Sequence, residues 1–125
     1  MRKTILFLNI VLLLLAVLTS CSNDINKTIQ GDWIAESADQ KVGTTDFLNK
    51  YNYVNIQEEE MNFRLYSREQ LDDKTLRVLS STNEKVKYDL NKNSITINDS
   101  HYQIEIQQDE MIIKNDNIEI LYIRE

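Results

Sequence analysis

The chain has 125 residues, with 14 basic and 20 acidic side chains, a formal net charge of −6 and one cysteine. This length suits one domain, and a single cysteine excludes an intrachain disulfide. The acidic balance disfavours nonspecific binding to nucleic acid, which needs a basic face to displace counterions from phosphate.

The first twenty residues have the features of a targeting segment. Arg2 and Lys3 form a short basic start, and an apolar run of fourteen positions from 5 to 18 is interrupted only by Asn9. A transmembrane helix needs roughly 20 apolar residues, so the run is too short to span a bilayer. Leu18-Thr19-Ser20-Cys21 resembles the lipobox of bacterial lipoproteins, in which cleavage occurs before the cysteine. An ordinary secretory signal with an incidental cysteine is the alternative.

This resemblance implies a signal peptide over 1–20, a lipidated tether over 21–28 and a domain over 29–125. Cys21 would carry diacylglycerol, and the new N-terminus would carry an acyl chain such as palmitate; two or more chains anchor a protein stably to membrane lipid. Ser22 is not the aspartate that retains lipoproteins at the inner membrane of enteric bacteria, so the expected location is the outer membrane of the cell envelope. Cleavage leaves 12 basic and 20 acidic residues, a charge that disfavours adsorption to anionic lipid, so the anchor must supply the membrane attachment.

The domain is predicted to be all-β after one helical turn. Asp24 can cap this turn, in which Ile25 and Ile29 share a face. After Gly31, apolar residues recur at every second position, the pattern of strands with one buried face. Turns rich in Asn and Asp, which tolerate positive φ, separate the runs. The pattern predicts strands over 32–38, 51–58, 61–67, 74–80, 85–90, 94–98, 101–107, 110–114 and 118–124, with the weakest alternation in 74–80.

These short strands predict an up-and-down antiparallel meander barrel of 8–10 strands. Closure with antiparallel pairing throughout requires an even number, and nine would leave a seam. The long connection 39–50 is predicted to hold a helical turn within 44–49. The run 118–124 is partly apolar on both sides, so we expect its outer face to be covered.

The side chains predicted to point inward are mostly large and branched, which favours a packed interior over a large cavity. They are Trp33, Ala35, Val54, Ile56, Met61, Phe63, Leu65, Leu76, Val78, Val86, Tyr88, Leu90, Ile95, Ile97, Tyr102, Ile104, Ile106, Met111, Ile113, Ile118, Ile120 and Tyr122.

Ile29-Gln30-Gly31-Asp32-Trp33 resembles the Gly-x-Trp opening of the lipocalin and fatty-acid-binding barrels. The lipobox shortly before it, the long loop after the first strand and the closely spaced hairpins extend the likeness to small lipocalin-like lipoproteins of the Bacteroidetes type, over 25–125. The resemblance implies that Trp33 closes one barrel end beneath an arginine of the last strand, here Arg124. The alternative is a core tryptophan and a solvated terminal arginine.

Two functions remain open at this point. One is a module that binds a small apolar ligand near the barrel mouth, with Tyr51, Tyr53, Tyr66 and Phe63 as candidate lining residues. The other is an interaction protein with a solid barrel, an inhibitor or envelope-assembly factor, that binds a protein partner through its outer face or loops.

No enzyme activity, metal site or cofactor is predicted. His101 is the only histidine, and a zinc or copper site needs further imidazole or thiolate ligands. Glu58, Glu59 and Glu60 point alternately to opposite faces of a strand, so they do not converge on a cation. The sequence shows no nucleophile with an accompanying base and orienting group.

Overall fold

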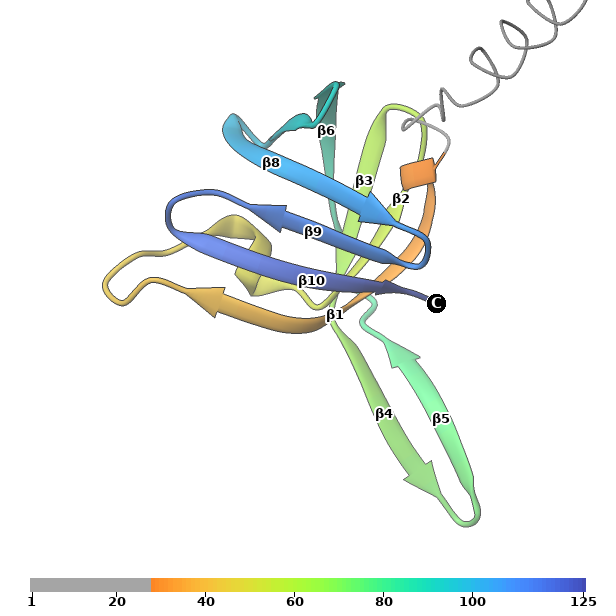
Figure 1. Ribbon diagram of the computed structural model, residues 1–125. Helices are drawn as coiled ribbons and strands as arrows, with labels where there is room; N and C mark the ends of the chain where they lie inside the picture. The colour runs from red at the N-terminus through yellow and green to blue at the C-terminus, as the bar shows by residue number, and fades with distance from the viewer. Residues whose placement is uncertain (1–27) are drawn as a thin grey trace, which may run out of the picture.

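A computed structural model describes residues 28–125 (Figure 1). Thr28 and Ile29 are helical, at the position where the sequence predicts a helical turn; Asp24 and Ile25 lie outside the described residues. The elements that follow are β1 (Gly31–Gln40), η1 (Phe47–Lys50), β2 (Tyr53–Ile56), β3 (Glu60–Arg64), β4 (Tyr66–Leu71), β5 (Lys74–Leu79), β6 (Glu84–Asn91), β7 (Ser94–Ile97), β8 (Ser100–Gln107), β9 (Glu110–Lys114) and β10 (Ile118–Arg124).

Eight strands close into an antiparallel barrel in the order β1-β10-β9-β8-β7-β6-β3-β2. The closing pair is β1 with β10, in which Trp33 lies opposite Arg124 and Gln40 opposite Ile118. A β-bulge between Ala35 and Ser37 shifts the register within this pair. The predicted all-β fold and antiparallel barrel are therefore confirmed, and the number of barrel strands is even, as antiparallel closure requires.

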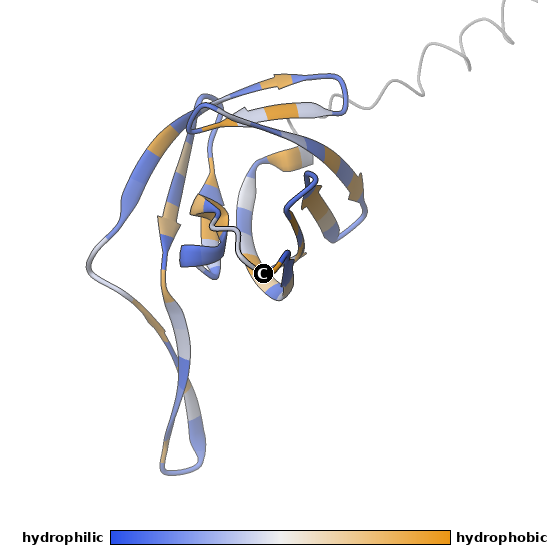
Figure 2. Cartoon of the chain, turned by 90° about the vertical axis from the view of Figure 1, so that its left-hand side faces the viewer, coloured by the Kyte–Doolittle hydropathy of each residue, from blue (hydrophilic) through white to orange (hydrophobic). Residues whose placement is uncertain are grey.

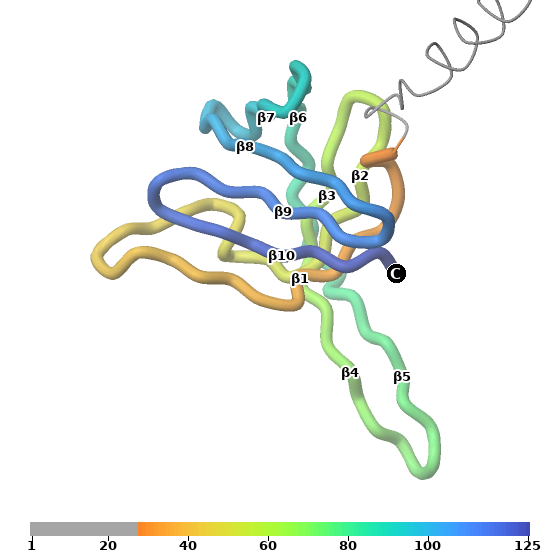
Figure 3. Tube along the Cα trace, in the orientation of Figure 1, coloured from red at the N-terminus to blue at the C-terminus, as the bar shows by residue number. Residues whose placement is uncertain are grey.

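The two remaining strands, β4 and β5, form a separate hairpin that we call the arm (residues 66–79). Figures 1 and 3 show it projecting away from the barrel. The arm is inserted between β3 and β6, which pair directly with each other, Met61 opposite Val86. The predicted strand 61–67 was therefore wrong as one element, because the barrel strand ends at Arg64 and the arm begins at Tyr66.

The barrel interior is a single apolar core formed by alternate residues of the barrel strands, the alternation visible in Figure 2. Two buried residues, Ile29 and Leu48, come from the helical segments rather than from strands. They were not among the side chains predicted to point inward. The core cluster is Ile29, Trp33, Leu48, Val54, Ile56, Met61, Phe63, Ile95, Ile97, Tyr102, Ile104, Met111, Ile113, Ile118, Ile120 and Tyr122.

Three residues predicted to point inward are exposed instead. Leu65, Leu76 and Val78 have exposed fractions of 52%, 44% and 37%. A period-two pattern identifies a strand with an apolar face, but it does not say whether that face packs against a barrel core. Here the strand that carries Leu76 and Val78 pairs only with β4 in the described part of the chain.

The turns and the long connection agree with the sequence pattern. Asp72, Asn98 and Asp99 have positive φ, so acidic and amide side chains stand at left-handed turn positions in place of glycine. The connection after β1 contains η1, which overlaps the second half of the helical turn predicted within 44–49 and ends one residue later. On the outer face of β10, Leu121 and Ile123 are half-buried, which agrees with a partly covered outer face.

Candidate functional site

Trp33 and Arg124 meet at the barrel end where β1 starts and β10 finishes. The guanidinium carbon of Arg124 lies 4.2 Å from the centroid of the Trp33 ring, and Trp33 is fully buried. Arg124 also donates to the carbonyl oxygens of Gln30 (2.9 Å) and Thr28 (2.6 Å), while the indole Nε1 donates to the carbonyl of Ile29 (2.8 Å). The structure brings the predicted pair together, and the pair fastens the N-terminal turn to the last strand.

Gly31 makes this arrangement possible. Its φ of +128° lies in a region that side chains with a Cβ rarely adopt. A Cβ at this position would lie 3.0 Å from Nη1 of Arg124, which is the atom that donates to Gln30. The glycine of the Gly-x-Trp motif is therefore favoured by the backbone conformation, and a Cβ there would also make Arg124 shift.

Gly31→Ala is expected to lower the free energy of unfolding by roughly 1–3 kcal/mol, because it strains the backbone and pushes Arg124 away from its carbonyl partners. Urea denaturation of the two proteins measures the difference. Gly43→Ala is the matched control, since Gly43 also has a positive φ (+84°) but open space where the Cβ would lie. An equal cost for both substitutions would show that the contact with Arg124 contributes nothing.

At the other end of β1, the connection 41–50 folds over the barrel mouth. Asp46 caps η1 by accepting a hydrogen bond from the backbone N–H of Leu48 (2.8 Å). The same carboxylate accepts the Tyr102 hydroxyl at 2.9 Å on both oxygens, and burial together with this bond raises the pKa of Tyr102 above its ordinary value. Because Leu48 is fully buried, η1 acts as a plug that Asp46 ties to β8.

Aromatic rings continue the packing beneath the plug. Phe47 meets Phe63 edge-on at 5.1 Å between centroids and lies 5.6 Å from Tyr51. Phe63 is buried, whereas the Tyr51 hydroxyl reaches the surface and donates to Glu84 (2.6 Å). Such ring pairs add about 0.5–1.5 kcal/mol to the free energy of area burial, so this cluster holds the mouth closed.

The four candidate lining residues do not share one pocket. Tyr51 and Phe63 lie together, 5.9 Å apart, under the mouth, but Tyr53 and Tyr66 stack on each other at 6.5 Å on the outer face. Tyr53 donates to Asp32, and burial with this bond raises its pKa to about 12. Tyr51 and Tyr53 lie apart because β2 begins only at Tyr53. Tyr51 precedes the strand, so the alternation of side chains between the two faces of β2 does not fix its direction.

Tyr122 is one of three residues in the described chain with a buried side-chain polar atom that has no hydrogen-bond partner, the others being Asn62 and Arg64. It is fully buried, and its hydroxyl has no hydrogen-bond partner among residues 28–125. Burial raises the pKa of its phenol, with smaller contributions from Tyr102 and Asp46. An unpaired buried hydroxyl costs about 1–3 kcal/mol, so this group weakens the fold unless a partner outside residues 28–125 bonds to it.

Tyr122→Phe is therefore expected to raise the free energy of unfolding by roughly 1 kcal/mol, because it removes the unpaired hydroxyl and keeps the ring. Chemical denaturation of both proteins at neutral pH measures the change. A loss of stability of similar size would mean that a bound molecule satisfies the hydroxyl in solution.

A hollow of about 490 Å³ lies between the arm and the outer surface of β1 and β10, and we call it the arm cleft. Arg77 of the arm forms an ion pair with Glu125 across it, and Arg68 donates through Nε to the Tyr66 hydroxyl (3.0 Å). The residues that line the arm cleft are Ile34, Ala35, Glu36, Asn52, Tyr66, Arg68, Arg77, Ile123, Arg124 and Glu125. The cleft therefore combines guanidinium groups with an apolar floor.

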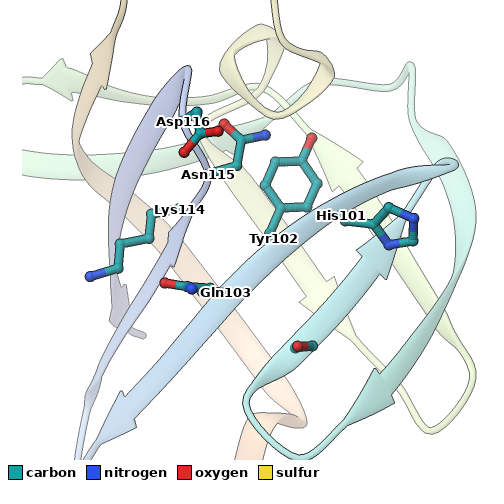
Figure 4. Close-up of a pocket in the computed structure, with 7 residues that line it drawn as sticks. His101, Tyr102, Gln103, Lys114, Asn115 and Asp116 are labelled. Atoms are coloured by element: carbon teal, nitrogen blue, oxygen red, sulfur yellow. The ribbon is translucent and has the colours of Figure 1, made fainter.

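A second depression, of about 590 Å³, lies over β7, β8 and β9 (Figure 4). His101 shares a hydrogen bond with the Thr96 hydroxyl (2.9 Å), and Lys114 forms an ion pair with Glu105 (3.4 Å). In Figure 4 the Tyr102 ring points toward the plug, away from His101. Two polar side chains of this depression, His101 and Lys114, are thus bonded to neighbours on the barrel surface.

Within residues 28–125, no three His, Cys, Asp or Glu side chains gather closely enough to hold a metal ion. Of the helices in the described chain, none has the length and apolar character to cross a membrane. Cys21, the predicted lipidation site, lies outside the described residues. No protein-family model matches the chain, and comparisons with curated proteins and with solved structures returned no match.

Proposed function

We propose that this chain is a lipid-anchored interaction protein of the bacterial cell envelope, whose solid barrel presents the arm to a protein partner. The observation that carries the proposal is where the apolar side chains lie. The interior is filled by a continuous buried cluster, whereas Leu71, Leu76 and Val78 are exposed on an arm that adds nothing to that cluster. Exposed apolar patches of this kind mark sites of interaction.

The barrel mouth supports this proposal over a ligand carrier. Leu48 is buried within the plug and Phe63 is buried beneath it, and Asp46 ties the plug to Tyr102. Ligand pockets of the usual kind have volumes of roughly 300–1,000 Å³ and are mostly apolar. A molecule of that size would have to displace these side chains before it could enter the barrel.

The backbone of the arm adds a second argument. In the described chain β4 and β5 pair only with each other, so each has one edge with unpaired N–H and C=O groups. Free edges of this kind are templates for strand addition by another chain. The arm therefore offers backbone hydrogen bonds together with exposed apolar side chains.

The anchor is the second part of the proposal, and the lipobox-like Leu18-Thr19-Ser20-Cys21 supports it. We expect Cys21→Ser to abolish incorporation of labelled fatty acid and to leave the protein uncleaved or soluble. Incorporation into the Cys21→Ser protein at the level of the parent would disprove the anchor. For the anchored protein, protease treatment of intact cells would establish whether the barrel faces the periplasm or the exterior.

Photo-crosslinking in living cells tests the role of the arm. A photoreactive amino acid at Leu76 is expected to yield one protein adduct of constant mass, because Leu76 lies on the exposed apolar side of the arm. Glu105, exposed on the outer face of β8, is the control position and should give none. If the arm gave no adduct, or if both positions gave the same adducts, the arm would not be the contact surface.

A carrier of a small apolar molecule is the second candidate, favoured only by the unpaired Tyr122 hydroxyl under the plug. In that function the ligand would supply the missing hydrogen bond. The stability of Tyr122→Phe distinguishes the two candidates. In a carrier the substitution removes a hydrogen bond to the ligand and lowers the free energy of unfolding. In a solid barrel it removes an unsatisfied hydroxyl and raises that free energy.

A further inference from the structure

We infer that the segment recognised by the arm is an extended strand of a partner protein with acidic and apolar side chains in alternation. This inference rests on the proposed function and specifies the chemistry of the partner. The strand would add to a free edge of the arm, with its carboxylates on the side of the arm cleft and its apolar side chains on the opposite side.

The two faces of the arm differ in chemistry. Residues paired directly across an antiparallel hairpin share a face, and the register of β4 with β5 therefore assigns each side chain. One face carries the pairs Tyr66 with Leu79, Arg68 with Arg77, and Gln70 with Thr75. The other carries Ser67 with Val78, Glu69 with Leu76, and Leu71 with Lys74. We call them the arginine face and the apolar face.

The arginine face has unbalanced positive charge. Arg68 and Arg77 lie directly opposite each other, and like charges in that position destabilise a strand pair. Within residues 28–125 Arg68 takes part in no ion pair, whereas Arg77 is paired with Glu125. A carboxylate brought by a partner would give Arg68 the kind of ion pair that Glu125 gives Arg77 on the same face.

The arm cleft is the space that the carboxylates of such a strand would face. Tyr66, Arg68 and Arg77 line it from the arm, and Ile34 and Ile123 form an apolar floor on the barrel. Both isoleucines are half-buried, so part of their surface is still open to an incoming side chain. Glu36 of β1 also lines the cleft. Its negative charge repels a carboxylate placed next to the barrel, so the carboxylates of the partner are expected next to the arm.

Strand geometry then selects the sequence pattern of the partner. Successive side chains of a strand point to opposite faces, so a strand added to the arm presents every second residue to the arginine face. On a strand added along the free edge of β5, acidic residues at those positions lie next to Arg77, with Arg68 one strand further across the same face. The residues between them lie next to Leu76 and Val78 on the apolar face. Alternation of glutamate with an aliphatic residue satisfies both faces at once.

A labelled peptide of alternating glutamate and valine tests this inference directly. Its binding to the full lipoprotein, extracted in detergent micelles, would be followed by fluorescence anisotropy. We expect Arg68→Gln or Arg77→Gln to weaken binding roughly threefold each and the double variant roughly tenfold, as for exposed ion pairs. Lys74→Gln is the matched control, because it removes one positive charge from the other face of the same arm, and it should leave the affinity unchanged.

Each result has one meaning. No binding of the peptide, equal binding of a glutamine–valine peptide, or an equal loss in Lys74→Gln would overturn the inference. The proposed function fails separately, if the crosslink from Leu76 is absent in cells. A crosslink that persists in the Arg68→Gln and Arg77→Gln double variant would keep the arm as the contact surface and reject acidic recognition.

Discussion

Phe63→Ala is expected to lower the free energy of unfolding by roughly 3–5 kcal/mol, as for the truncation of a core aromatic. Phe63 is buried in the core cluster and meets the ring of Phe47 edge-on beneath the plug. Its removal leaves a cavity and unseats η1 at the same time. Denaturation in urea, with unchanged slope in the mutant, measures the loss.

Leu76→Ala is the control for this prediction. The sequence pattern placed both Phe63 and Leu76 in the core, but the structure exposes Leu76 on the arm. The arm substitution should therefore change stability by no more than about 0.5 kcal/mol. A large loss from Leu76→Ala would mean that the arm packs against the barrel, and near-normal stability of Phe63→Ala would mean that the interior is not solid.

Trp33→Ala is expected to have an effect at least as large, roughly 4 kcal/mol or more, since truncation of a buried aromatic costs 3–5 kcal/mol and cation–π packing adds about 0.5–2 kcal/mol. Trp33 also donates to the carbonyl of Ile29, so the N-terminal turn loses this hydrogen bond as well. This loss is a large fraction of the free energy of unfolding of a typical domain, which is about 5–15 kcal/mol. We expect a protein that is largely unfolded at mild denaturant concentration.

Arg124→Met tests the contribution of the arginine separately from that of the tryptophan. It keeps an apolar side chain over the indole but removes the donors to Gln30 and Thr28, so it should cost less than Trp33→Ala and still release the N-terminal turn. Hydrogen exchange of the amides near residue 30 reports that release. If Arg124→Met left both stability and exchange unchanged, the arginine would be a solvated terminal residue.

The barrel could be predicted from the sequence because the pattern that identifies each strand lies within the residues of that strand. Alternation such as Tyr102, Ile104 and Ile106 defines a strand and its inner face, and Gly31 with Trp33 marks the first strand. The arm could not be separated from the barrel in the same way. Val78 alternates like a core residue, and its partner strand 66–71 is polar on most positions, so the pattern in the sequence does not show that the two strands leave the barrel together.

The plug and the arm cleft depend on contacts between distant parts of the chain. Asp46 and Tyr102 are 56 residues apart, and Arg77 and Glu125 are 48 residues apart. No periodicity encodes such pairs. The one sequence signal that pointed to the cleft was the apolar outer side of β10, where Ile123 forms part of the floor.

Native mass spectrometry of the protein extracted from its own membranes tests most directly whether the barrel is a solid scaffold. The mass under native conditions would be compared with the denatured mass, after exchange into two unrelated detergents. A solid barrel predicts equal masses, with covalent lipid as the only addition to the chain. One small apolar molecule per chain, present natively in both detergents and lost on denaturation, would contradict a solid barrel and make the protein a ligand carrier.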